Sequence, residues 1–227
     1  MNDTPKLADR SEATRRALIE AAIAEFARDG FHAASNREIA RTANANQALI
    51  GYHFGGKEGL YLAVFQFIAE QIQTRVGARV ALIEAHLAST PAGVELDAAQ
   101  RETCITLLLG LVEGMTRMFT DPRAKPWAQL IMREQQAPTK AFDILFEGFM
   151  GRYLTHVTEL IQRLRPQDTR DQIALSVMTV LGQILVFRVA RSTLLRHMAW
   201  EDVGAAEVDL ILRLIRTNVI AMLNAQD

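Results

Sequence analysis

A tight turn between two short helical segments is the feature that most constrains how this chain can fold. Ser35-Asn36-Arg37-Glu38 matches a capping box, in which a serine hydroxyl and a glutamate side chain satisfy free backbone donors at the start of a helix. Asn44 follows soon after and tolerates the left-handed conformation that a tight turn needs. Asn46 is a good N-cap for a second short helix, which Gly55-Gly56 ends. This order predicts a helix-turn-helix.

The segments on both sides of the motif also follow a helical period. Apolar residues between 19 and 26 recur at three-and-four spacing, and Gly30 is placed to end that helix in the left-handed conformation. With 49% hydrophobic residues and only six prolines in 227, the composition favours an all-α protein. We expect an unstructured arm over 1–9, a long helix opening at Lys57, and further helices near 75–88, 97–120, 126–136, 139–164, 169–197 (divisible after Arg188) and 205–224.

Charge gives no support to a nucleic-acid function. Residues 1–56 carry seven Lys or Arg and seven Asp or Glu, and the whole chain has a net charge of −1. A strong nucleic-acid binder usually shows a basic patch. A DNA-binding prediction therefore depends on the motif alone.

Residues 11–72 resemble the DNA-binding domain of the TetR family of transcriptional regulators. Three motifs carry the resemblance in order: Phe26-Ala27-Arg28-Asp29-Gly30-Phe31, Arg37-Glu38-Ile39-Ala40 and Tyr52-His53-Phe54-Gly55-Gly56-Lys57-Glu58-Gly59-Leu60. The stretch from Ile50 to Tyr61 is similar to the subgroup named for a cefoperazone and chloramphenicol sensitivity regulator. The chain departs from the family at Asn44, where many members have glycine, and at Gly51, where many have an aromatic residue.

The resemblance implies a ligand-responsive DNA-binding regulator, expected to be a repressor that a small molecule releases from palindromic operator DNA. It divides the chain into an arm and a three-helix DNA-binding domain over 1–56, and a helical domain over 57–227 that binds an effector and forms a homodimer. No cofactor is implied. The single cysteine, Cys104, cannot form an intrachain disulfide, and we expect a soluble, cytoplasmic protein without a membrane-spanning segment.

The predicted DNA contacts lie at the start of the second motif helix and just beyond it. In a helix-turn-helix the N-terminal residues of this helix face the bases, which gives Asn46, Gln47 and Ala48. Gln47 can pair with an adenine edge and Ala48 can touch a thymine methyl group. For Asn46, the alternative to a base contact is a purely capping role. We expect phosphate contacts from Arg37, Tyr52, His53 and Lys57, with a structural hydrogen bond as the alternative for His53.

The C-terminal part contains candidates for effector binding and dimerisation. Methionine and aromatic residues suit an adaptable apolar pocket, although ordinary core packing also explains them. The predicted lining residues are Met115, Met118, Phe119, Trp127, Met132, Phe146, Phe149 and Met150. Arg133, Glu134 and His156 are candidate polar anchors. Apolar stripes over 173–185 and 210–222 predict a two-helix contact from each subunit.

Two other functional classes remain open. A helical enzyme would need polar groups converging in the C-terminal part, but no second pair accompanies His156 and Glu159 as metal ligands, and no phosphate-binding glycine loop is present. We therefore expect no enzyme. A helical protein-interaction module that has lost DNA binding is compatible with the neutral N-terminal charge and with Gly51.

Overall fold

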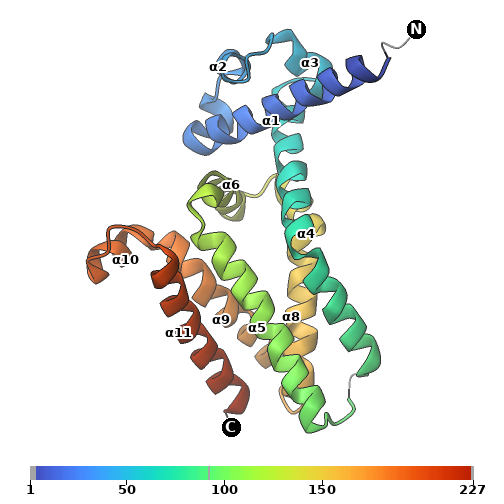
Figure 1. Cartoon of the computed structure of the whole chain (residues 1–227), viewed down its shortest axis with the longest axis vertical. Coiled ribbons are helices and arrows are strands. Elements are labelled where there is room, and N and C mark those ends of the chain that lie inside the picture. Colours follow the sequence, from blue (N-terminus) through green and yellow to red (C-terminus); the bar gives the residue numbers. More distant parts are fainter. Residues whose placement is uncertain (1–3, 92, 226–227) are drawn as a thin grey trace. The chain divides into compact units, whose positions relative to one another are not determined.

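The computed structural model describes residues 4–91 and 93–225, and all regular secondary structure in these ranges is helical (Figure 1). The chain divides into two compact units. Unit 1 comprises residues 1–74 and 125–150, and unit 2 comprises residues 75–124 and 151–227. The predicted all-α class is confirmed.

Unit 1 opens with the predicted three-helix arrangement and the start of a long fourth helix. The elements are α1 (Thr4–Ala33), α2 (Asn36–Thr42), α3 (Ala48–Phe54) and α4 (Lys57–Ser89). Gly30 interrupts α1 with a φ of 78°, and Asn44 turns the chain between α2 and α3 with a φ of 50°. Gly55 and Gly56 separate α3 from α4 at φ 73° and 127°. Gly30 and Asn44, the positions predicted to need the left-handed backbone conformation, both have positive φ angles.

Three local expectations were wrong. Ser35 precedes α2 as predicted but makes no side-chain capping hydrogen bond, and the Glu38 side chain pairs with Arg41 one turn along the helix. The predicted arm is helical from Thr4 onward, and residues 1–3 lie outside the described residues. The predicted break near residue 75 is absent, since α4 continues to Ser89.

Unit 1 is completed by a later segment of the chain. It contributes α6 (Lys125–Gln136), α7 (Lys140–Leu145) and a π-helical segment, η2 (Phe146–Met150). α6 packs on α1. A Cβ at Gly148 would lie 2.7 Å from the Cβ of Ala69 on α4, so glycine permits η2 to approach α4 this closely. The predicted single helix over 139–164 is therefore divided at this contact.

Unit 2 is a layered helical bundle. Besides the second half of α4 and the short 3-10 turn η1 (Pro122–Ala124), it contains α5 (Ala98–Thr120), α8 (Gly151–Leu164), α9 (Arg170–Val189), α10 (Arg191–Met198) and α11 (Ala205–Asn224). α5 lies in the middle and packs against α8, α9 and α11 (Figure 1). Capping boxes fix the starts of α5 and α9, at Asp97 with Gln100 and at Thr169 with Gln172.

Arginine side chains close the ends of three helices in unit 2. Arg163 donates to the carbonyl oxygen of Leu87 in the last turn of α4 at 3.3 Å, and to that of Thr90 just beyond the helix at 2.7 Å. Arg101 donates to the last residue of α8 at 3.0 Å, and Arg165 donates to two carbonyl groups at the end of α11 at 3.1 and 2.5 Å. The last carbonyl groups of a helix lack internal partners and carry partial negative charge. These guanidinium groups supply both the donors and the opposite charge.

The predicted apolar stripes on α9 and α11 are divided between the interior and the surface. Ile173, Val177, Val180 and Ile184 of α9 are buried, as are Ile211, Ile215 and Val219 of α11. The exposed apolar residues of these two helices are Leu175, Met178, Val186, Val189, Leu210 and Leu214. Among the described helices α9 alone is long and apolar enough to cross a membrane by length and composition, with a mean hydropathy of 1.7.

Candidate DNA-binding site and its supports

The turn between α2 and α3 is fixed by backbone hydrogen bonds and by the apolar residues beneath it. The N–H groups of Asn44 and Ala45 donate to carbonyl groups of α2, at 3.1 and 2.9 Å. Ile39 on α2 and Ile50 on α3 are 0% and 1% exposed. Burying such side chains stabilises a fold by roughly 1.5 to 3 kcal/mol each. The short helices are therefore held by their packing more than by their own hydrogen bonds.

The start of α3 presents polar groups to solvent. Asn46, Gln47 and Ala48 are all exposed. The Asn46 Oδ1 atom accepts a hydrogen bond from the Ala48 N–H at 2.8 Å, so Asn46 has the capping role that the sequence predicts. Gln47 precedes the first residue of α3 and has its amide group exposed. The geometry places the three predicted base-contacting residues together at one exposed helix end.

The residues predicted to contact phosphates lie on α2, α3 and the start of α4, and they differ in exposure. Tyr52 is 79% exposed, and Arg37 is also exposed. His53 is half-buried, with its ring centroid 5.0 Å from that of Tyr52. The Lys57 Nζ atom donates to a carbonyl oxygen of α1, that of His32, at 3.0 Å. Lys57 therefore also joins the start of α4 to the end of α1.

Gly51 leaves open space on α3. A Cβ at this position would have no atom within 4 Å. The absence of a side chain is therefore not required by packing within the chain. Gly59 is different, because a Cβ there would lie 1.8 Å from the carbonyl oxygen of Phe54. Gly59, the last glycine of the motif Tyr52–Leu60, is therefore required for a steric reason in the turn from α3 to α4.

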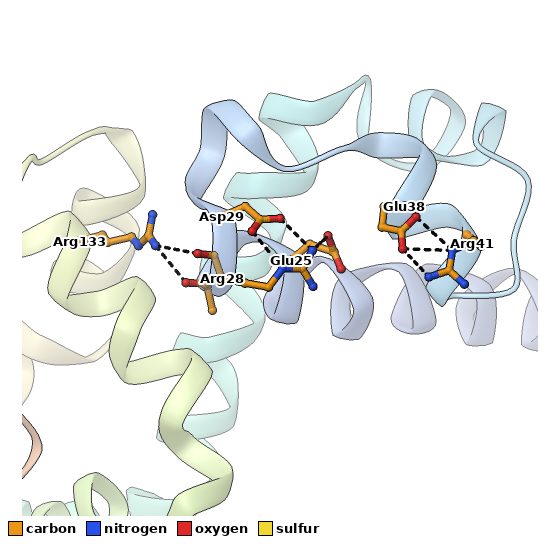
Figure 2. A network of polar contacts seen from close by, with 7 residues as sticks. Glu25, Arg28, Asp29, Glu38, Arg41 and Arg133 are labelled. Carbon is orange, nitrogen blue, oxygen red and sulfur yellow. Dashed lines mark hydrogen bonds and ion pairs between the residues drawn. The ribbon is translucent and has the colours of Figure 1, made fainter. Parts of the chain in front are cut away.

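Figure 2 shows a polar network at the end of α1. Arg28 donates to Glu25 at 2.6 Å and to Asp29 at 2.8 and 3.0 Å. The hydrogen bonds that Asp29 accepts from Arg28 lower the pKa of Asp29, and donation to Asp29 and Glu25 raises the pKa of Arg28. On α2, Glu38 is paired with Arg41 in the same manner. In each case the arginine is paired with a carboxylate on its own helix.

Arg133 on α6 binds the backbone of α1. Its Nη2 atom donates to the carbonyl oxygens of Ala27 and Arg28, at 3.1 and 3.3 Å (Figure 2). A Cβ at Gly30 would lie 2.3 Å from the Arg133 guanidinium, so Gly30 both breaks α1 and leaves room for this contact. We name this contact the Arg133 clasp. The sequence suggested Arg133 as an effector anchor, and nothing local indicated that it caps α1.

A second polar group on α6, Glu134, is buried and fully engaged. It is 2% exposed, accepts from the Tyr61 hydroxyl at 2.8 Å, and accepts from the N–H and hydroxyl of Thr139 at 2.9 Å each. Burial, followed by the hydrogen bond to Glu134, raises the pKa of Tyr61. Glu134 thus connects α4, α6 and the N-cap of α7 within unit 1.

The predicted effector residues are distributed over both units. Met115, Met118 and Phe119 lie on one stretch of α5 in unit 2. Unit 1 holds the other five: Trp127 and Met132 on α6, and Phe146, Phe149 and Met150 on η2. Met115, Phe119 and Phe149 are buried, whereas Phe146 is 45% exposed. Core packing explains the buried ones equally well, so the effector contacts remain predictions.

Comparison with known proteins decides the family. Residues 18–64 match the model of bacterial regulatory proteins of the tetR family. Residues 105–226 match the C-terminal domain of the HTH-type transcriptional dual regulator CecR. The chain is also 30% identical to the CecR protein of Shigella flexneri over 218 residues, which cover 96% of this chain and 94% of that protein. The chain belongs to the TetR family, with a C-terminal domain of the CecR type.

Solved structures of other TetR-like regulators share the fold. AibR, solved in complex with isovaleryl coenzyme A and operator DNA, aligns with a TM-score of 0.64 at 14% identity, covering 91% of this chain and 97% of AibR. FadR from Bacillus subtilis, solved with stearoyl-CoA, aligns with a TM-score of 0.58 at 13% identity, covering 93% and 99%.

The family assignment bears on the sequence predictions. It confirms a DNA-binding transcriptional regulator of the TetR family and the predicted subgroup. Because the family and its relatives are transcriptional regulators, the expectation that the chain is not an enzyme is confirmed as well. The individual DNA and effector contacts, and the boundary at residue 56, remain predictions.

Proposed function

We propose that this TetR-family regulator is a cytoplasmic homodimer that represses transcription from a palindromic operator until a small molecule releases it. The observation that carries the proposal is the exposed start of α3, where Gln47 and Ala48 stand beside a capping Asn46 above a buried apolar base. Residues 1–56 serve as the DNA-binding domain and residues 57–227 as the effector and dimerisation domain.

In the proposed complex, the first turn of α3 enters the major groove. Gln47 donates to and accepts from an adenine edge, and Ala48 contacts a thymine methyl group. Arg37, Tyr52, His53 and Lys57 bind phosphates on either side and fix the register. Because unit 1 has no marked basic excess, its affinity depends on these few contacts and on two subunits binding at once.

Dimerisation is proposed through α9 and α11. Leu175, Met178, Leu210 and Leu214 are 45 to 67% exposed, although each lies on a helix whose other face packs in unit 2. A second copy of the same surface would cover these side chains in an isologous four-helix contact. Such burial also explains why α9 combines a membrane-like hydropathy with a place in a soluble regulator.

Effector binding is supported by buried polar atoms that have no hydrogen-bond partner among the described residues. The Tyr153 hydroxyl and both ring nitrogens of His156, all on α8, are buried without a hydrogen bond among the described residues. Buried polar groups are nearly always paired, so these positions favour a ligand or bound water in unit 2. The acyl-CoA complexes of AibR and FadR show that this fold accommodates a small molecule.

Release from DNA requires that the effector prefer a different spacing of the two reading helices. Two such helices must lie about 34 to 36 Å apart to enter successive major grooves. α4 runs from unit 1 into unit 2, because its residues 57–74 belong to unit 1 and its residues 75–89 to unit 2. A ligand that binds better to one position of α4 would shift the dimer away from the DNA-competent state.

Titration of a palindrome from upstream of the gene tests the proposal. Fluorescence anisotropy should show a salt-sensitive complex of one dimer per palindrome. Lys57→Ala should weaken it and reduce the salt slope by about 1 if Lys57 contacts a phosphate, whereas Lys125→Ala should leave both unchanged. A chain that binds this palindrome no better than unrelated DNA would contradict the proposal.

A further inference from the structure

Two arginines lie one helical turn apart at the junction of α9 and α10. Arg188 is in the last turn of α9, and Arg191 is the first residue of α10. The Nη2 atom of Arg188 and the Nη1 atom of Arg191 are buried and have no hydrogen-bond partner among the described residues. The other terminal nitrogen of Arg191 pairs with Asp202. Each guanidinium therefore has at least one buried N–H group available.

Nearby carboxylates do not satisfy these groups. Asp121, at the end of α5, attracts Arg188 electrostatically but is hydrogen-bonded to Arg123 at 3.0 and 3.1 Å. Arg75 on α4 also acts on Asp121 and contributes to its lowered pKa, which is due chiefly to Arg123. Asp121 is therefore engaged by Arg123, and Asp202 pairs with the Nη2 atom of Arg191 while the Nη1 atom has no hydrogen-bond partner among the described residues.

The pair of Arg188 and Arg191 is costly as it stands. Burial lowers the pKa of Arg188, and the neighbouring positive charge of Arg191 lowers it further, while Asp121 opposes both effects. A buried charged donor without a partner loses its hydration with nothing in return. Interaction with the negative end of α9 would offset part of this cost, but the Arg188 Nη2 atom reaches no helix carbonyl. An external oxyanion would satisfy both guanidinium groups.

We propose that Arg188 and Arg191 bind the anionic group, a phosphate or carboxylate, of the small-molecule effector. This inference rests on the proposed function, because it assumes that unit 2 binds an effector. Guanidinium groups form paired, charge-assisted hydrogen bonds with planar or tetrahedral oxyanions. Two of them one turn apart supply enough donors for one such group. The effector is accordingly an acidic molecule.

Inorganic phosphate and acetate are suitable probes, because they present the two candidate groups without an apolar part. Each is titrated into the dimer against sodium chloride at equal ionic strength, and binding is followed by the thermal unfolding midpoint. The structure predicts that at least one of the two raises the midpoint of the wild type above that in chloride. The more effective anion identifies the group. Equal midpoints in all three salts would overturn the proposal.

Substitutions locate the site. Arg188→Gln should weaken the apparent affinity for the effective anion about tenfold or more, whereas Arg213→Gln, an exposed arginine on α11, should not change it. Arg191→Gln should weaken it as well. Equal weakening by the α11 control, or none by Arg188→Gln, would refute the assignment.

Thermal unfolding without added anion distinguishes a binding role of Arg188 from a structural one. Without added anion, Arg188→Met should leave the unfolding midpoint unchanged or raise it, because it removes a buried charge that lacks a partner. A marked fall would show that Arg188 is needed for folding rather than for binding. Operator affinity separates the two proposals: Arg188→Gln should bind the palindrome like the wild type but resist release by the effective anion. Failure of the wild type to bind DNA while anion binding persists would count against the proposed function alone.

Discussion

The two exposed surfaces of this regulator differ in chemistry. At the start of α3 in unit 1, Asn46 and Gln47 present amide groups above a buried apolar base. On α9 and α11 in unit 2, Met178 and Leu214 present apolar side chains at 48 and 56% exposure. A polar surface on a rigid base suits a hydrated, patterned partner such as DNA. An apolar surface suits the proposed contact between subunits, and the contrast agrees with the proposal that unit 1 recognises DNA and unit 2 forms the dimer.

The largest effect is expected from placing charges on the apolar surface of α9 and α11, which should disrupt the proposed dimer. The double variant Met178→Glu/Leu214→Glu places four like charges in the proposed contact, so we expect monomers in analytical ultracentrifugation and at least about a hundredfold loss of operator affinity. Leu82→Glu, on the exposed face of α4, should remain dimeric and bind normally. A double variant that stays dimeric would place the subunit contact elsewhere.

Removing the buried carboxylate of unit 1 should have the next largest effect. Glu134→Ala leaves the Tyr61 hydroxyl and the Thr139 donors without their acceptor, so unfolding in urea should become easier by about 1 to 3 kcal/mol. Glu147→Ala, at an exposed position on η2, is the matched control and should change stability by no more than about 0.5 kcal/mol. If Glu134→Ala were as stable as the wild type, the hydrogen bonds of Glu134 to α4 and to the N-cap of α7 would not be needed for stability.

Filling the empty side of α3 should separate stability from recognition. Gly51→Ala meets no neighbouring atom, so the helix should gain about 0.5 to 1 kcal/mol in the free energy of unfolding. If DNA approaches this part of the backbone, operator affinity should fall in the same variant. Thermal unfolding and anisotropy on one sample measure both. If Gly51→Ala were less stable than the wild type, the space around this position would not be open.

The smallest expected effect is a pH dependence in unit 2. Burial lowers the pKa of His156, although Glu84 lies 3.5 Å from its Nε2 atom and opposes this shift. Below about pH 6.5 the unfolded chain binds a proton that the folded chain resists, so the free energy of unfolding should fall as the pH drops below that value. His156→Phe should flatten this dependence, and the exposed control His197→Phe should retain it. If the pH dependence of stability were unchanged in His156→Phe, His156 would not be its cause.

Local backbone rules predicted the fold more fully than they predicted its contacts. Asn44 and Gly55 could be placed because a left-handed turn restricts the residue type at a single position. The capping box failed at Glu38, where an arginine one turn away competed for the same carboxylate. Periodicity also gave no sign of the division at η2, because Gly148 meets Ala69 from a distant part of the chain.

The same limit explains which functional residues were missed. The Arg133 clasp and the Arg188 and Arg191 pair depend on groups brought together by folding, and arginines on helices usually lie in solvent. The exposure of Gln47 could be predicted because a helix-turn-helix exposes a fixed position of its second helix, whereas its contact with a base remains a prediction. Family resemblance added the functional class, which balanced charge alone would have argued against.

The base preference of Gln47→Ala tests the central claim most directly. Operator affinity is measured for wild type, Gln47→Ala and the exposed control Gln162→Ala, on the palindrome and on palindromes with one symmetric base-pair change. The account predicts that Gln47→Ala loses about 1 to 3 kcal/mol on the intact operator and no longer distinguishes one of the changed base pairs, while Gln162→Ala matches wild type. Full affinity and unaltered base preference in Gln47→Ala would contradict the assignment of α3 as the reading helix.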